Sequence, residues 1–206
     1  MIEAITYNDM INYIQDNEVA EDVVGILITR PDLHTGEEII KSLNYYHHLT
    51  SKNINFYLPG FGAFWSLSDY PDMNVVTEID SVKWSFSYKA FVEFIEALEE
   101  MSKWKYSGES ELLLIPYYNN NFDFSEVVVF SLDLMLNDGT ISSVSSFITG
   151  LSRCVKNADS IVSITANGAM RCIAGAIIEG ITDTIPSYIS KPLGRGRHYI
   201  CRDFSL

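Results

Sequence analysis

Cysteines, basic residues and long apolar runs are all scarce in this sequence. The three cysteines are Cys154, Cys172 and Cys201, and none of them stands in CxxC spacing, which argues against a disulfide framework and against a zinc site. We therefore expect a reduced protein without a metal or another cofactor. No apolar run reaches the roughly 18 residues of a membrane-spanning helix, and no apolar signal-peptide core follows Met1. These absences predict a cytoplasmic protein that does not bind membranes.

The charge of the chain is strongly one-sided. It has 14 Lys and Arg against 27 Asp and Glu, so its formal net charge is −13. A surface of this sign repels a polyphosphate backbone, and we expect no non-specific binding to nucleic acid. With 47% hydrophobic and 13% aromatic residues, the chain can bury enough apolar surface to fold. Its length is that of one ordinary domain, so we expect a single α/β domain over residues 1–206.

The N-terminal part of the sequence predicts a strand–helix–strand unit. The apolar run at 23–29 is typical of a strand buried on both faces. Thr35 and Glu38 have the spacing of a capping box at the start of a helix that continues to about residue 49. A second strand is predicted at 53–58. Such a unit favours a right-handed crossover between parallel strands.

The rest of the chain is predicted from apolar periodicity, strand-forming runs and turn residues. The short connection between the predicted strands at 111–117 and 126–134 favours an antiparallel hairpin. The predicted elements are an aromatic loop at 63–84 with a short strand at 74–78, helices at 86–104, 140–156 and 169–181, a strand at 160–165, and an irregular basic tail at 182–206. The expected fold is a three-layer, Rossmann-like α/β fold whose mixed sheet is mostly parallel with one antiparallel hairpin.

Ligands of open α/β sheets bind outside the carboxyl ends of the parallel strands, and the first such position follows the strand at 23–29. Arg30 and Asp32 lie there, and Glu38 lies one helical turn further on. With Arg30 beside it, Glu38 is a candidate general base, or a carboxylate that stabilises a ribosyl cation during glycosyl-bond cleavage. The structural alternative is that Glu38 only closes the capping box with Thr35.

The segment Pro59–Trp65 follows the second predicted strand. Gly60 and Gly62 allow a ligand to approach the backbone, while Phe61 and Trp65 offer rings for stacking. The segment lacks both the GxGxxG spacing and the lysine of a phosphate-binding loop. The alternative is a glycine turn whose aromatic side chains pack in the core.

Two further candidates lie near the end of the chain. Asn167 and Gly168 connect a predicted strand to a helix, where free amides can bind an anion, although small residues there also permit close packing. Arg195 and Arg197 are spaced by glycine and can reach a phosphate or carboxylate. They can equally tie the tail to the acidic body of the protein.

These features favour a domain that binds or cleaves a small molecule of the nucleotide or nucleoside-like class, with glycosyl-bond hydrolysis as the candidate reaction. The alternative is a non-catalytic interaction or scaffold protein that forms a homo-oligomer or binds a protein partner. Its 11 Phe, 12 Tyr and 3 Trp can supply a large apolar interface. Whether the chain is an enzyme stays open at this point.

Overall fold

A computed structural model describes residues 2–16, 23–50, 56–64, 68–157 and 199–206. Its elements in chain order are β1 (Ile2–Ala4), α1 (Tyr7–Asp16), β2 (Val23–Ile28), α2 (His34–Thr50), β3 (Phe56–Pro59), β4 (Phe61–Gly62), β5 (Asn74–Ile79), β6 (Val82–Phe86), α3 (Tyr88–Met101), β7 (Glu111–Tyr118), β8 (Asn121–Phe122), the 3₁₀ helix η1 (Phe124–Glu126), β9 (Val127–Ser131), α4 (Leu132–Asn137), α5 (Val144–Asn157) and β10 (Tyr199–Arg202). The predicted strand at 160–165 and helix at 169–181 lie outside the described residues.

The main sheet has the strand order β1-β3-β2-β7-β9-β10, and β8 pairs with β7. Strand β3 runs parallel to β1 and β2, as the crossover through α2 requires. The pairings of β2 with β7, β7 with β9, β9 with β10 and β7 with β8 are all antiparallel. The predicted mostly parallel, Rossmann-like sheet is therefore wrong.

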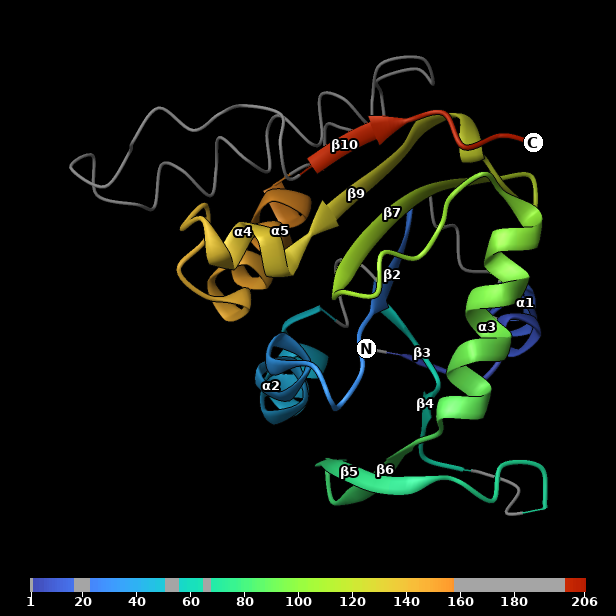
Figure 1. Cartoon of the computed structure of the whole chain (residues 1–206), viewed down its shortest axis with the longest axis vertical. Helices are drawn as coiled ribbons and strands as arrows, with labels where there is room; N and C mark the ends of the chain where they lie inside the picture. Colours follow the sequence, from blue (N-terminus) through green and yellow to red (C-terminus); the bar gives the residue numbers. More distant parts are fainter. Residues whose placement is uncertain (1, 17–22, 51–55, 65–67, 158–198) are drawn as a thin grey trace.

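The direction of β7 follows from the path of the chain after α3. Figure 1 shows residues 102–110 running back along the sheet from the end of α3 to the start of β7. Lys103 donates its amide to Phe204, whereas Ser110 lies beside Thr29 at the carboxyl end of β2. This extended segment has already returned the chain to the end of the sheet where β2 finishes. Strand β7 starts there and therefore runs antiparallel to β2. A strand that started directly after α3 would have been parallel.

A second, separate sheet takes up the second half of the predicted aromatic loop at 63–84, and β5 confirms the short strand predicted at 74–78. This sheet is antiparallel and has the order β4-β6-β5. The turn between β5 and β6 places Asp80 and Ser81 at positive φ, the geometry of a tight hairpin turn. Glycine and asparagine are the usual residues at such positions, so the pair Asp-Ser did not signal the hairpin. A register shift between Val75 and Thr77 also interrupts the alternating pattern that marks a strand.

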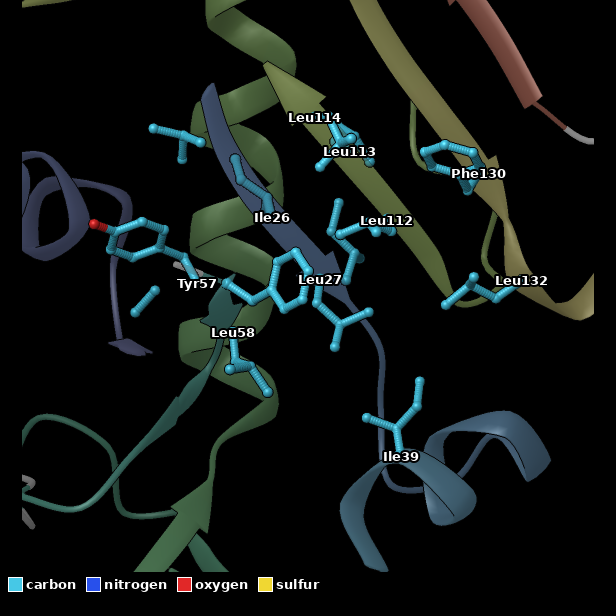
Figure 2. Packing of buried hydrophobic residues seen from close by; sticks show 14 of the residues in the cluster. Ile26, Leu27, Ile39, Tyr57, Leu58, Leu112, Leu113, Leu114, Phe130 and Leu132 are labelled. Carbon is cyan, nitrogen blue, oxygen red and sulfur yellow. The ribbon is translucent and has the colours of Figure 1, made fainter. Parts of the chain in front are cut away.

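Helices lie on both sides of the main sheet. In Figure 1, α1 and α3 lie together on one side, and α2, α4 and α5 lie on the other. Figure 2 shows part of this core, with Leu27 of β2 and Leu112 of β7 on the sheet and Ile39 on α2. All three side chains are fully buried. Of the helices that the structure describes, none has the length and apolar character needed to cross a membrane.

The predicted irregular tail at 182–206 is described only in its last eight residues. Tyr199–Arg202 form β10, which pairs antiparallel with β9. Beyond it, the amide of Phe204 donates to Phe124 and its carbonyl accepts from Lys103, both at 2.7 Å. The final residues thus connect the start of the 102–110 segment to the 3₁₀ helix η1.

Candidate functional site

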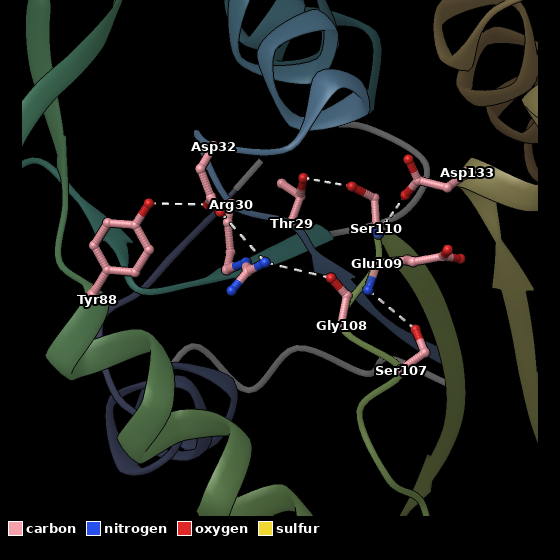
Figure 3. A network of polar contacts seen from close by, with 9 residues as sticks. All are labelled: Thr29, Arg30, Asp32, Tyr88, Ser107, Gly108, Glu109, Ser110 and Asp133. Atoms are coloured by element: carbon pink, nitrogen blue, oxygen red, sulfur yellow. Dashed lines mark hydrogen bonds and ion pairs between the residues drawn. The ribbon is translucent and has the colours of Figure 1, made fainter.

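The candidate site lies at the carboxyl end of β2, between α3 and the 102–110 segment. Figure 3 shows Arg30 and Asp32 after β2, facing Tyr88 of α3. The Nη2 atom of Arg30 lies 3.4 Å from Oδ2 of Asp32 and donates to the carbonyl oxygen of Gly108, also at 3.4 Å. The hydroxyl of Tyr88 donates to Oδ1 of Asp32 at 3.0 Å. The structure therefore brings two of the predicted residues, Arg30 and Asp32, into direct contact.

The backbone of Arg30 is held by the turn that leads into α2. Its carbonyl oxygen accepts from the amide of Leu33. Gly36, in the first turn of α2, lies so close that an added Cβ would come within 1.8 Å of that oxygen. The absence of a side chain at Gly36 is therefore what allows α2 to start directly over Arg30.

The guanidinium of Arg30 makes few and long hydrogen bonds for a charged group. Its side chain is 28% exposed, yet its Nε atom is buried and makes no hydrogen bond to any described residue. Charge-assisted contacts of arginine are usually about 2.7–2.9 Å long, so both contacts at 3.4 Å are loose. Arg30 consequently keeps donors that an anion can use.

Two more buried polar side chains lie close in sequence to Gly108, one in the 102–110 segment and one at the start of β7. The hydroxyl of Tyr106 is buried and unpartnered among the described residues. Burial raises the pKa of Tyr106 to about 12, although Arg30 lowers it and the nearby acid Glu111 raises it further. Tyr106 therefore stays a protonated hydrogen-bond donor at neutral pH, within electrostatic range of both Arg30 and Glu111.

Glu111 is the first residue of β7 and is only 4% exposed. Burial raises the pKa of its carboxyl group, and side-chain hydrogen bonds from Ser107 and Trp104 partly counteract that shift. Its Oε2 atom has no hydrogen-bond partner among the described residues. A buried carboxyl group in such a position favours the neutral form, which can donate a hydrogen bond.

A second polar cluster lies at the same edge on the side of α2 and α4. The hydroxyls of Thr29 and Ser110 are 2.8 Å apart. The carboxylate of Asp133 accepts from the Ser110 amide at 2.6 Å and from the Thr35 hydroxyl at 2.5 Å. Short bonds of this kind to a carboxylate stabilise the fold, and we assign this cluster a structural role.

The predicted capping box of Thr35 and Glu38 is not formed. Helix α2 begins at His34, and the hydroxyl of Thr35 is used by Asp133. Oε1 of Glu38 instead accepts from the amide of Val144 at 3.1 Å, so it caps the first turn of α5. This contact explains Glu38 without a substrate, although it joins residues far apart in the sequence.

The glycines and Phe61 after β3 serve packing. Gly60 has a φ of +75°, and an added Cβ would lie 2.8 Å from the Cβ of Phe91, so only glycine permits this approach to α3. Phe61 is fully buried and its ring centroid lies 4.7 Å from that of Phe86. Gly62 is buried in β4. These residues are placed by the small sheet and α3.

The remaining predicted site residues are not described. Trp65, Asn167, Gly168, Arg195 and Arg197 all lie outside the described residues. Within the described part of the chain, no group of three or more His, Cys, Asp or Glu side chains has an arrangement that could hold a metal ion.

Sequence reasoning missed Tyr88, Tyr106 and Glu111. One local signal existed for Glu111, because it is an acid at the head of the otherwise apolar run Leu112–Ile115. An acid in that position is expected at an exposed strand end, whereas in the structure it is buried and hydrogen-bonded to Trp104 and Ser107 of the 102–110 segment.

Comparisons of the chain with protein-family models, with curated proteins and with solved structures found no match.

Proposed function

We propose that the chain binds a small anionic ligand of the nucleotide or nucleoside-like class at the carboxyl end of β2, with Arg30 as the charge partner. The observation that supports this proposal is the state of the guanidinium, which has loose contacts and a buried, unpartnered Nε atom. A buried donor without a partner costs about 1–3 kcal/mol, and more when it is charged. A phosphate that accepted two hydrogen bonds from Arg30 would remove this cost.

The exposed rim of the site supports the nucleotide-like class. Asp32 is an exposed carboxylate that is already oriented by Tyr88, and a carboxylate in this position is suited to accept hydrogen bonds from ribose hydroxyls. Tyr88 is 45% exposed, so part of its ring is open to contact with a planar base. The rim thus offers a hydroxyl acceptor and an aromatic surface next to a cation.

Glycosyl-bond hydrolysis at this site has less support than binding. The sequence pointed to Glu38 as the catalytic carboxylate, but that side chain is engaged with the Val144 amide. The proposal is therefore made for binding, and cleavage of the bound ligand stays a separate hypothesis.

The test is calorimetric titration of the full chain with 5′-AMP, adenosine and inorganic phosphate. Because hydrogen bonds to a charged group contribute about 1.5–3 kcal/mol, Arg30→Ala is expected to weaken 5′-AMP binding at least tenfold. Arg30→Lys should restore only part of the affinity, since lysine cannot form the two-pronged contact. Arg202→Ala is the matched control, because Arg202 is an exposed arginine of β10. Equal binding by Arg30→Ala and the unchanged chain would contradict the proposal.

A non-catalytic role in self-assembly or in binding a protein partner is the second candidate, supported by apolar exposure around the small sheet. Phe64 follows β4 and is 79% exposed, and Val75 of β5 is 60% exposed. Side chains of this kind are typical of interfaces when they gather in one patch. Light scattering over a range of concentrations tests this role. A monomer at every concentration would contradict self-assembly, and a dimer that Phe64→Ser disrupts would support it.

A further inference from the structure

Residues 107–109 precede Glu111, and few hydrogen bonds hold their backbone, although the side chain of Ser107 hydrogen-bonds to Glu111. On one side, the amide of Tyr106 donates to Glu99 at 2.9 Å. On the other side, Ser110 is fixed by Asp133 at 2.6 Å. Between these anchors, Arg30 donates to the carbonyl oxygen of Gly108 from outside the segment, at 3.4 Å. Gly108 has a φ of +91° and no heavy atom within 4 Å of its added Cβ, so the segment has open space beside it.

The same arginine therefore has two roles in the geometry. It is the cation of the proposed site, and it contacts the backbone of the segment that joins Tyr106 to Glu111. An anion that forms bonds of about 2.8 Å with a guanidinium is a much stronger partner than a carbonyl oxygen at the outer limit of hydrogen bonding. Binding of such an anion would therefore remove Arg30 from Gly108 and leave residues 107–109 held by the Ser107–Glu111 hydrogen bond, which makes the segment easier to displace.

Two side chains close in sequence to Gly108 have unused polar atoms. The Tyr106 hydroxyl and the Oε2 atom of Glu111 are buried and unpartnered among the described residues. Trp104 and Ser107, both in the 102–110 segment, hydrogen-bond to Glu111. Tyr106 packs edge-on against Phe91 of α3 at a centroid distance of 5.6 Å. Both polar groups thus lie on the α3 side of the sheet, the side on which Arg30 reaches Gly108.

We propose that Tyr106 and Glu111 are further ligand-binding residues. They become accessible when a phosphate monoester binds Arg30 and breaks its contact with Gly108. The hydroxyl groups of both side chains then donate hydrogen bonds to the phosphate oxygens. This inference rests on the proposed function, because Arg30 is the group that both the ligand and the segment compete for. It adds a substrate class, a phosphate-bearing ligand, and a dependence of binding on pH.

The pH dependence arises because only the neutral form of Glu111 can donate to an anion. Ionisation would place a carboxylate against the ligand's own negative charge. Burial is the main cause that disfavours ionisation of Glu111, and the carboxylate of Glu109 adds to it, whereas hydrogen bonds from Ser107 and Trp104 oppose it. Tyr106 lies within electrostatic range of Glu111 and also of Arg30, Asp32 and Asp133.

The first test measures 5′-AMP affinity between pH 5 and 9 for the unchanged chain, Glu111→Gln and Tyr106→Phe. Glutamine still donates but cannot ionise. Above the pKa of Glu111, the affinity of the unchanged chain should fall by up to tenfold per pH unit relative to that of Glu111→Gln. The ionisation of the phosphate itself affects both proteins equally. Tyr106→Phe should bind about tenfold more weakly at every pH, since it loses one hydrogen bond to a charged group.

The second test is hydrogen exchange of the backbone amides at 107–109. Phosphate binding should accelerate exchange there, in contrast to the protection that ligands usually cause, and Arg30→Ala should accelerate it without ligand. Identical pH profiles for the unchanged chain and Glu111→Gln, or full affinity in Tyr106→Phe, would overturn this inference while leaving anion binding at Arg30 intact. Absence of binding by 5′-AMP and phosphate at every pH would instead overturn the proposed function, and this inference with it. Thermal melts of each variant verify that it is folded.

Discussion

The two faces of the sheet at the carboxyl end of β2 differ in how completely their polar groups are satisfied. On the side of α2 and α4, Thr29, Ser110, Thr35 and Asp133 form short, mutually bonded contacts. On the side of α3, the contacts of Arg30 are loose, and buried atoms of Arg30, Tyr106 and Glu111 have no hydrogen-bond partner in the described part of the chain. The two clusters meet at adjacent residues, because successive residues of a strand point to opposite faces.

The difference separates a structural cluster from a candidate binding site. A fully bonded polar network rigidifies the fold, whereas a partly bonded one destabilises it unless a ligand completes it. Perturbed and unsatisfied groups are for this reason concentrated at functional sites. The bonded face holds α4 to the sheet, and the open face is the one we propose for the ligand. Substitutions on each face should therefore have opposite effects on stability.

The largest effect is expected for Gly36→Ala, which disturbs the turn that both faces share. An added Cβ would lie 1.8 Å from the carbonyl oxygen of Arg30 and 3.0 Å from the Thr29 hydroxyl. Because both neighbours are fixed, the substitution should reduce the free energy of unfolding by about 3 kcal/mol or more. Gly139→Ala is the control, since it has positive φ but open space, and it should cost about 1 kcal/mol. Denaturant titration measures both, and equal losses would contradict the steric argument.

Removal of the acceptor on the bonded face should come next. Asp133→Ala leaves the Ser110 amide and the Thr35 hydroxyl without their partner, so we expect a loss of about 2–3 kcal/mol in the free energy of unfolding. Asp133→Asn keeps one acceptor oxygen and should lose less. A loss below about 0.5 kcal/mol in Asp133→Ala would show that the bonded face does not stabilise the fold.

On the open face, removal of the ionisable group should stabilise the protein. Folding raises the pKa of Glu111, so the folded state binds the proton more tightly than the unfolded state. Stability is therefore lost as pH rises from the usual pKa of glutamate through the raised value. Glu111→Gln should be more stable than the unchanged chain at pH 8, on the order of 1 kcal/mol, and this advantage should vanish near pH 4. Thermal melts at both pH values measure it, and a less stable variant at pH 8 would contradict the assignment of Glu111 to the unsatisfied face.

The smallest effect is expected at Glu38. Glu38→Gln retains an oxygen that can accept from the Val144 amide, so stability should change by less than about 0.5 kcal/mol, whereas Glu38→Ala should lose about 1 kcal/mol. Neither variant should alter 5′-AMP affinity beyond twofold, because Glu38 lies outside the proposed site. A strong loss of binding or of an activity in Glu38→Gln, without loss of stability, would restore the catalytic interpretation of this residue.

Local patterns in the sequence predicted several elements well. The apolar run at 23–29 corresponds to β2, and the amphipathic pattern at 86–104 contains α3. The predicted strand at 126–134 was too long, because Leu132 already begins α4. The amide of Leu132 donates to the carbonyl of Ser110, and this long-range bond helps to hold the start of α4 beside β7. Periodicity thus identified elements but not all of their ends.

The sequence by itself determined that the segments of β2 and α3 form a strand and a helix, and that Arg30 and Asp32 follow a buried strand. Only the tertiary structure decided the direction of β7, the partner of Glu38 and the burial of Glu111. Apolar periodicity depends on neighbours within a few residues and is therefore readable from the chain. The other features depend on tertiary contacts, among them the path of residues 102–110. This segment carries no periodic pattern, and it brings Gly108 beside Arg30, which is far away in sequence.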